Sequence, residues 1–253
     1  LIANLADDNV AEIAAEAVCK VQGYGLDPDF NWAAGDISIS SGLTRFNISK
    51  EGKFWSQMSV GLAGEHNCLN SLAVCAIMDH LGVSPPDFEQ GLRNFGGVKR
   101  RQEVRGIENG VTVIDDFAHH PTAVKETLSA LKSGYGDRRL VAVFEPRTNS
   151  SRRAIFQTDY VSTFDAADLV LLREPTPIEG LGPDELFSSS KLAADLISTR
   201  KLNAESFATT DEILERLSDV LKEGDVVAIL SNGGFDNIHN RLLAQLREAK
   251  KIN

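Results

Sequence analysis

The chain contains few cysteines, and their spacing matches neither a disulfide framework nor a structural zinc site. Only Cys19, Cys68 and Cys75 occur in 253 residues, and we expect no metal-ligating set among them. Cys68 and Cys75 lie seven residues apart on an expected helix, where both can be buried as small apolar residues. A reducing, cytosolic compartment is the corresponding expectation.

Basic charge and long apolar runs are also scarce. The 26 Lys and Arg residues against 36 Asp and Glu residues give a formal net charge of -10. This balance argues against a general nucleic-acid binder, which needs clustered positive charge to neutralise phosphates. No apolar run is long enough to span a membrane, and no signal peptide is recognisable. We therefore expect a cytoplasmic protein with small-molecule ligands. Leu1 stands in mid-pattern, so we expect the chain to be part of a longer protein.

Two phosphate-binding motifs are missing from the sequence. It contains no G-x-x-x-x-G-K-[ST] loop and no G-x-G-x-x-G after an expected strand. Gly52-Lys53 is followed by Phe54 and falls in an expected hairpin turn. By itself, the chain therefore has no recognisable motif for binding the triphosphate of a nucleotide.

The first part of the chain combines helices with a small antiparallel sheet. A turn at Asp7-Asp8-Asn9 leads into a helix within residues 1–24, and period-two segments then predict three short strands over residues 37–39, 43–48 and 54–60. Residues 40–42 and 50–52 have hairpin-turn chemistry. A helix is expected over residues 67–81, ending at Gly82.

Beyond Gly96-Gly97, a candidate hinge or domain boundary, strand-like and helix-like segments alternate. The expected strands cover residues 111–115, 140–144, 169–172, 205–208 and 226–230. The expected helices cover residues 122–131, 153–164, 192–197, 211–221 and 237–246. This alternation favours an α/β fold with a Rossmann-like, mostly parallel sheet and helices on both faces.

Polar residues follow most of these expected strands. They are Asp115-Asp116 with His119-His120, Glu145-Pro146-Arg147, Arg173-Glu174, and Ser231-Asn232-Gly233-Gly234. In open parallel sheets, ligands bind beyond the carboxyl ends of the strands. Exposed loops are polar as well, so a ligand site and an ordinary solvated surface both remain open.

The run over residues 115–121 is the densest of these elements. A carboxylate that ends a strand can accept hydrogen bonds from a ribose, or hold a metal through water. His119 and His120, at an expected helix start, could contact an anionic substrate or an ion. The alternative is a helix-capping aspartate beside surface histidines.

Two further elements have a ligand interpretation and a structural one. His66, Asn67 and Asn70 stand at an expected helix start, and an asparagine amide can pair with an adenine edge; an ordinary helix start with a packed histidine is the alternative. The basic run 99–101 follows Gly97 and fits a phosphate contact, although a solvated charge run is the commoner explanation.

Taken in order, the runs 64–70, 97–101 and 115–121 resemble motifs of the Mur ligase family, the ATP-dependent amide-forming enzymes of peptidoglycan synthesis. The resemblance extends from Asp7 to Asn240, nearly the whole chain. Within the family, Phe117-Ala118 and the runs 144–147 and 231–239 resemble the member that recycles L-alanyl-γ-D-glutamyl-meso-diaminopimelate onto UDP-N-acetylmuramate. The member that adds L-alanine typically has Tyr-Gly in place of Phe-Ala.

The resemblance implies that residues 1–94 end a central ATP-binding domain and that residues 95–253 form a C-terminal, peptide-binding domain. The implied cofactors are ATP and Mg²⁺, with the metal ligands and the phosphate loop upstream of this chain, so the fragment alone should be inactive. The implied roles are adenine binding by His66, Asn67 and Asn70, ATP-phosphate contact by Arg101, ribose contact by Asp116, and peptide contact by His119, His120, Arg147, Ser231 and Asn232. Arg101 and His119 are the implied catalytic residues.

Three other interpretations stay open. The chain could belong to the UDP-N-acetylmuramate–L-alanine ligase, or it could be a non-catalytic nucleotide- or peptide-binding domain. An unrelated α/β domain that binds a small acid would have to produce three in-order motif matches by chance. The sequence predicts no particular oligomeric state.

Overall fold

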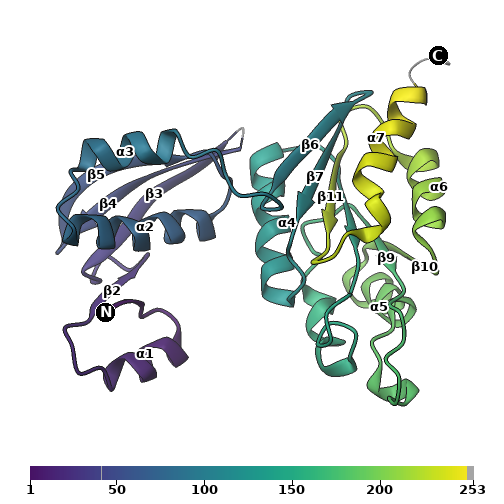
Figure 1. The fold of residues 1–253 in the computed structure, drawn as a ribbon, viewed down its shortest axis with the longest axis horizontal. Helices are drawn as coiled ribbons and strands as arrows, with labels where there is room; N and C mark the ends of the chain where they lie inside the picture. Colours follow the sequence, from purple (N-terminus) through teal and green to yellow (C-terminus); the bar gives the residue numbers. More distant parts are fainter. Residues whose placement is uncertain (41, 250–253) are drawn as a thin grey trace. The chain divides into compact units, whose positions relative to one another are not determined.

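The computed structural model describes residues 1–40 and 42–249. These residues form two compact units, with the boundary between Gly97 and Val98 (Figure 1). Ser41, part of the expected turn over residues 40–42, lies outside the described residues. Among the described residues, no helix has both the length and the apolar character that crossing a membrane requires.

The first unit is built on a five-stranded sheet. Its strands, in spatial order, are β1 (Ile2–Asn4), β2 (Gln22–Gly25), β3 (Trp32–Ser40), β4 (Leu43–Lys50) and β5 (Lys53–Val60). The three predicted antiparallel strands are confirmed as β3, β4 and β5. Two short parallel strands, β1 and β2, extend the sheet at the side of β3.

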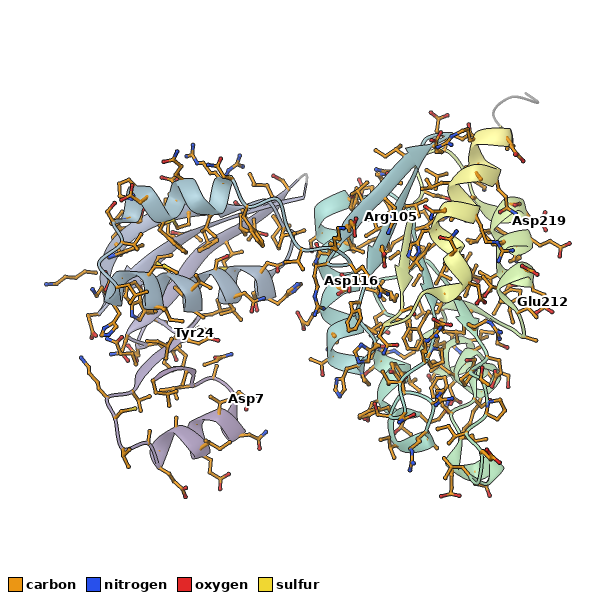
Figure 2. All side chains as sticks on the ribbon, in the orientation of Figure 1. Asp7, Tyr24, Arg105, Asp116, Glu212 and Asp219 are labelled. Carbon is orange, nitrogen blue, oxygen red and sulfur yellow. The ribbon has the colours of Figure 1, made fainter. Side chains whose placement is uncertain are left out.

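Three helices accompany this sheet, namely α1 (Asp8–Ala15), α2 (Glu65–His80) and α3 (Pro85–Arg93). The helix α1 is capped by the Asp7 carboxylate, which accepts a hydrogen bond from the backbone N–H of Val10 (Figure 2). The predicted burial of Cys68 and Cys75 on α2 is confirmed, because both lie in the core with Trp32 and Phe46. Burial raises the pKa of each thiol to about 12, as expected for inert structural cysteines.

The second unit contains a six-stranded sheet in the order β10-β9-β8-β11-β7-β6. Its strands are β6 (Glu103–Glu108), β7 (Val111–Asp116), β8 (Leu140–Phe144), β9 (Leu169–Arg173), β10 (Asn203–Phe207) and β11 (Val226–Leu230). All neighbouring strands are parallel except β6 and β7, which form a hairpin through Asn109 and Gly110. Both turn residues have a positive φ, as a tight hairpin turn requires. The predicted α/β class is confirmed, and β6 is an additional strand.

Helices cover both faces of this sheet, as predicted. They are α4 (Pro121–Tyr135), α5 (Ser189–Asp195), α6 (Thr210–Val220) and α7 (Ile238–Ala249). One core layer packs α4 and α5 against the sheet, and a separate layer packs α6 and α7 against it. A π-helical turn over Leu196–Arg200 continues α5. Glu212 completes a capping box with Thr209 at the start of α6 (Figure 2).

The prediction of a helix over residues 153–164 is wrong. The chain there forms two short 3-10 turns, Ala154–Phe156 and Asp159–Ser162. Arg153 is extended and forms a β-bridge with Leu186, which a helical residue cannot do. The apolar residues that suggested a helix pack instead as an aromatic cluster. The ring centres of Tyr160 and Phe164 lie 5.1 and 5.8 Å from the ring centre of Phe144.

Polar side chains at the amino ends of the strands of this second sheet are bonded to one another. The Arg139 guanidinium donates to both oxygens of Asp225 at 3.1 and 2.6 Å, and the Asp225 side chain is only 5% exposed. Arg138 donates to the carbonyl of Asp225 and to the Thr112 hydroxyl. These bonds join β7, β8 and β11 where the strands begin.

Candidate functional site

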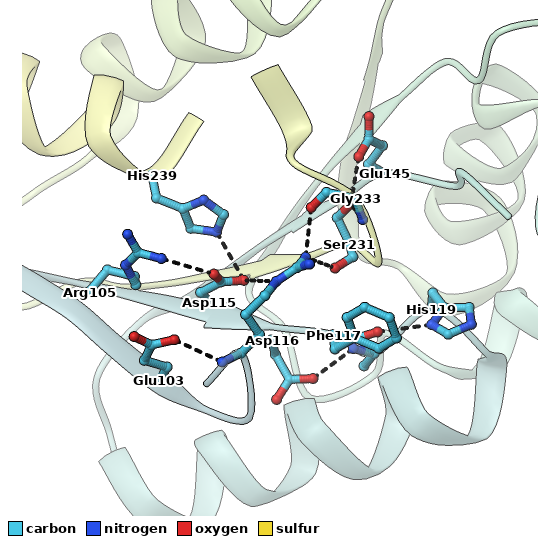
Figure 3. A network of polar contacts seen from close by, with 12 residues as sticks. Glu103, Arg105, Asp115, Asp116, Phe117, His119, Glu145, Ser231, Gly233 and His239 are labelled. Carbon is cyan, nitrogen blue, oxygen red and sulfur yellow. Dashed lines mark hydrogen bonds and ion pairs between the residues drawn. The ribbon is translucent and has the colours of Figure 1, made fainter. Parts of the chain in front are cut away.

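The carboxyl ends of the parallel strands bring most of the predicted polar residues of the second unit to one edge of its sheet. Asp115 and Asp116 end β7, Glu145 follows β8, Arg173 ends β9 and Ser231 follows β11. Figure 3 shows the part of this edge around β7 and β11. Parallel strands place such residues together because their carboxyl ends share one side of the sheet.

Arg100 is the centre of a polar network at this edge, whereas the family resemblance favours its neighbour Arg101. Its Nη2 donates to the carbonyl oxygens of Ser231 and Gly233, the latter at 2.7 Å, and its Nε lies 3.4 Å from Oδ1 of Asp115. The guanidinium is therefore engaged with the strand ends from inside the unit.

Asp115 is a buried carboxylate surrounded by potential donors. Its side chain is 3% exposed, and it lies 3.4 Å from Arg105 and 3.3 Å from Nε2 of His239. Burial acts to raise the pKa of Asp115, but the interactions with His239 and then Arg100 lower it below the ordinary carboxyl value. Asp115 therefore stays ionised and ties β7 to α7.

Asp116 faces a different set of partners. Its carboxylate accepts hydrogen bonds from the backbone N–H groups of Gln102 and Ala118, both at 2.8 Å, and from the Thr127 hydroxyl at 3.3 Å. Burial raises the pKa of Asp116, against the opposing effect of these bonds and of the Arg101 charge. The predicted ribose ligand is thus occupied with organising the backbone on either side of it.

Arg101 is exposed, unlike Arg100. It makes no side-chain hydrogen bond or ion pair within the described part of the chain, and its guanidinium lies 5.6 Å from the ring centre of Phe117. The Arg100 guanidinium lies 5.0 Å from the same ring. Phe117 thus contacts both arginines, and the donors of Arg101 remain available to an anion.

The two predicted histidines take separate positions. Nδ1 of His119 lies 2.9 Å from the carbonyl oxygen of Phe117, and the His119 carbonyl accepts a hydrogen bond from the Tyr160 hydroxyl. His120 precedes α4 and packs its ring 4.8 Å from that of Phe156. The His119 ring therefore has its second nitrogen, Nε2, without a partner among the described residues.

A cavity of about 390 Å³ opens above the ends of β8, β9 and β11. Its lining consists of Glu145, Pro146, Arg147, Arg152, Arg173, Glu174, Pro175, Thr176 and Asp236. Three arginines and three carboxylates therefore share this space. Of the residues predicted from sequence, Arg147 lines the cavity and is 54% exposed.

Several of these charges are already bonded within the protein. Glu174 accepts hydrogen bonds from the backbone N–H groups of Ser189 and Ser190 at the start of α5, and Asp236 accepts one from the Thr210 hydroxyl. These bonds satisfy part of the negative charge. Arg152 also bonds within the protein, since its Nη1 and Nη2 donate to the carbonyl of Thr176 and to Oδ1 of Asn149. Its Nε is buried and has no hydrogen-bond partner among the described residues.

Ser231 and Asn232 lie beside the cavity, on the loop after β11. The Ser231 hydroxyl donates to Oε2 of Glu145 at 2.5 Å and accepts a hydrogen bond from the backbone N–H of Gly233. Oδ1 of Asn232 is buried without a partner in the described structure. Ser231 therefore orients a cavity-lining carboxylate.

The predicted adenine-binding residues all lie in the first unit, at the start of α2. Nδ2 of Asn67 donates to the carbonyl of Ala63 at 2.8 Å, so this amide secures the helix start. Asn70 is exposed, and its amide makes no hydrogen bond within the described residues. His66 is half-buried. The three predicted residues thus share one helix turn, and Asn70 has its amide available for a ligand.

The described residues contain no cluster of three or more His, Cys, Asp or Glu side chains that could hold a metal ion. The carboxylates nearest to Arg100 and Arg101 are bonded to protein donors. These carboxylates, at the described edge of the sheet, therefore do not fit a magnesium site.

A family model described as "Mur ligase, glutamate ligase domain" matches residues 100–233, more than half of the chain. A curated UDP-N-acetylmuramate–L-alanine ligase from Geobacter sulfurreducens is 34% identical over 98% of this chain and 53% of its own length.

Two solved structures are similar to this chain. The crystal structure of a murein peptide ligase from Psychrobacter arcticus shares 31% identity, with a TM-score of 0.68 over 97% of this chain and 51% of that one. A MurF ligase from Thermotoga maritima, solved in complex with ADP, has a TM-score of 0.73 at 17% identity over 98% of this chain and 54% of that one, which shows a shared fold. The chain spans about half the length of the curated relatives it matches.

Proposed function

Because this chain belongs to the Mur ligase family, we propose that it is the C-terminal portion of an ATP-dependent ligase that joins a peptide to UDP-N-acetylmuramate. In this proposal, residues 1–94 end the central ATP-binding domain and residues 95–253 bind the acceptor. The wider enzyme would form an amide bond in peptidoglycan metabolism, in agreement with the names of its relatives.

The cavity is the observation that supports a peptide acceptor. The positive charges of Arg147, Arg152 and Arg173 line this cavity of about 390 Å³ and can attract carboxylates. L-Alanyl-γ-D-glutamyl-meso-diaminopimelate carries several carboxylates and a second amine, so it can use both the arginines and the acidic residues. A single L-alanine has one carboxylate and would use fewer of these charged groups.

The proposed nucleotide contacts involve Arg101 and Asn70, whose side-chain N–H groups make no hydrogen bond within the described residues. Arg101 would contact ATP phosphates and stabilise charge on the transferring group, while Asn70 would meet the adenine edge. For Asp116, the observed bonds support a role in fixing the backbone next to Arg101. In this proposal, the muramoyl carboxylate would attack the γ-phosphorus of ATP, which forms an acyl phosphate and releases ADP. The acceptor amine then attacks that carbonyl carbon, and inorganic phosphate leaves.

The second candidate is the UDP-N-acetylmuramate–L-alanine ligase. The observation in its favour is the name of the curated relative from Geobacter sulfurreducens, which is 34% identical. The structural relative at 31% identity is a murein peptide ligase. The two relatives have nearly equal sequence identity to this chain, so a direct test of the acceptor decides between the two candidates.

Calorimetric titration of the 253-residue chain with each acceptor tests the proposal. We expect the tripeptide to bind and L-alanine to give no heat at the same concentration. Arg147→Ala should weaken tripeptide binding, whereas Arg216→Ala, which removes an arginine paired with Glu205 outside the cavity, should not. Binding of L-alanine alone would favour the second candidate, and binding of neither would remove the acceptor role of the cavity.

A further inference from the structure

The side chain of Arg147 lies directly against the backbone of Gly233. A Cβ atom added at Gly233 would come within 2.2 Å of Cδ, 2.4 Å of Nε and 2.8 Å of Cζ of Arg147. All three atoms belong to the flexible outer part of the arginine, so a methyl group at this position would displace the guanidinium rather than the backbone. The adjacent Gly234 has no heavy atom within 4 Å of its virtual Cβ.

The backbone at Gly233 is held firmly from inside the unit. The Ser231 hydroxyl accepts a hydrogen bond from the Gly233 N–H at 2.9 Å, and Arg100 donates to the carbonyls of both residues. This arrangement defines the 231–233 turn. The same Ser231 hydroxyl donates to Glu145, whose other oxygen lies 3.7 Å from Nη1 of Arg147.

Arg100 is itself fixed by its own backbone contacts. Arg100 and Gln102 both have a positive φ, of 59° and 50°, which is uncommon for residues with side chains. Carboxylates hold both positions, since Glu103 accepts the N–H of Arg100 and Asp116 accepts that of Gln102, each at 2.8 Å. A strained segment that is held in this way is typical of functional sites.

We propose that Gly233 and Arg100 are positioning residues for the acceptor site: Arg100 anchors the 231–233 turn, and the bare Gly233 backbone sets the place of the Arg147 guanidinium in the cavity. This inference rests on the proposed function. Neither residue touches the acceptor in this scheme. Gly233 acts through Arg147, and Arg100 acts through the turn.

Steady-state kinetics of the longer ligase that contains this chain provide the test. Gly233→Ala should raise the KM for the tripeptide about ten- to a hundredfold, the range expected when a charge-assisted hydrogen bond is lost. The KM for ATP should stay unchanged. Gly234→Ala is the matched control, with no change expected in either KM. Arg100→Lys should also raise the tripeptide KM, since a single ammonium cannot reproduce the geometry of the guanidinium.

A double-mutant cycle separates positioning from general damage. If Gly233 acts through Arg147, adding Gly233→Ala to Arg147→Ala should change the tripeptide KM less than twofold further. A crystal structure of Gly233→Ala should show the Arg147 guanidinium displaced from its place. Full additivity of the two substitutions, or an unmoved Arg147, would overturn the inference. A wild-type ligase that does not use the tripeptide would instead overturn the proposed function.

Discussion

The two ends of the six-stranded sheet use the same residue types in opposite ways. At the amino end, Arg139 and Asp225 bond each other, and Arg138 donates to backbone and hydroxyl oxygens of neighbouring strands. At the carboxyl end, Arg101 makes no hydrogen bond or ion pair within the described residues, and Nε of Arg152 is buried without a partner. One end satisfies its polar groups internally, and the other retains unused donors.

This difference separates stability from ligand binding. Removing one member of a buried charge pair leaves its partner uncompensated, which destabilises the fold. Removing an exposed arginine without partners affects the fold little, but removes a donor that a ligand would use. The same contrast recurs in α2 of the first unit, where the Asn67 amide bonds Ala63 and the Asn70 amide makes no hydrogen bond within the described residues.

The largest effect on stability is expected from Asp225→Ala. This change leaves Arg139 without its carboxylate and removes the acceptor for the backbone N–H of Lys222. We expect a loss of about 3 kcal/mol in the free energy of unfolding, at the lower end of the range for buried pairs because Arg139 is partly exposed. Urea denaturation measures it. A loss below about 0.5 kcal/mol would show that the amino-end network contributes little.

A large effect on turnover, without an effect on folding, is expected from Arg101→Ala. If its guanidinium stabilises charge on the transferring phosphoryl group, kcat of the longer ligase should fall about 10²- to 10³-fold. The free energy of unfolding should change by less than about 0.5 kcal/mol. Lys99→Ala, two residues away and also exposed, is the control and should retain most activity. Unchanged turnover of Arg101→Ala would remove its phosphate role.

The smallest of the three effects is expected at the start of α2. Asn70→Ala should weaken ATP binding about tenfold, which corresponds to one lost hydrogen bond, and should leave stability nearly unchanged. Asn67→Ala should instead destabilise the chain by about 1 kcal/mol, because its amide secures the helix start. Titration of both variants with ATP measures the change in affinity, and urea denaturation measures the change in the free energy of unfolding. Unaltered ATP affinity in Asn70→Ala would return this residue to an ordinary surface position.

The sequence predicted the buried parallel strands of the second unit better than its other elements. β8 and β11 are short, uniformly apolar runs, and their predicted bounds match the structure. β6 escaped prediction because its sequence, with Gly106 and three charged residues, lacks a clear apolar alternation. The wrong helix at residues 153–164 had apolar residues at helical spacing, a pattern that aromatic packing against Phe144 also produces.

The sequence located the candidate site, but did not resolve its adjacent residues. The pairs Arg100-Arg101 and Asp115-Asp116 were both recognised, yet the partners of each side chain depend on backbone direction. Arg100 has a positive φ, and its side chain bonds the loop after β11; the sequence indicates neither feature. His239 joins the network only because α7 packs on β7, a contact between residues more than a hundred positions apart.

Phosphate release by the longer ligase, with ATP, magnesium and UDP-N-acetylmuramate, tests the proposed reaction most directly. The assay would compare L-alanyl-γ-D-glutamyl-meso-diaminopimelate with L-alanine as the acceptor. We expect release that depends on the tripeptide, because the cavity offers arginines to several carboxylates. Release that depends on L-alanine, or on neither acceptor, would contradict the proposed function.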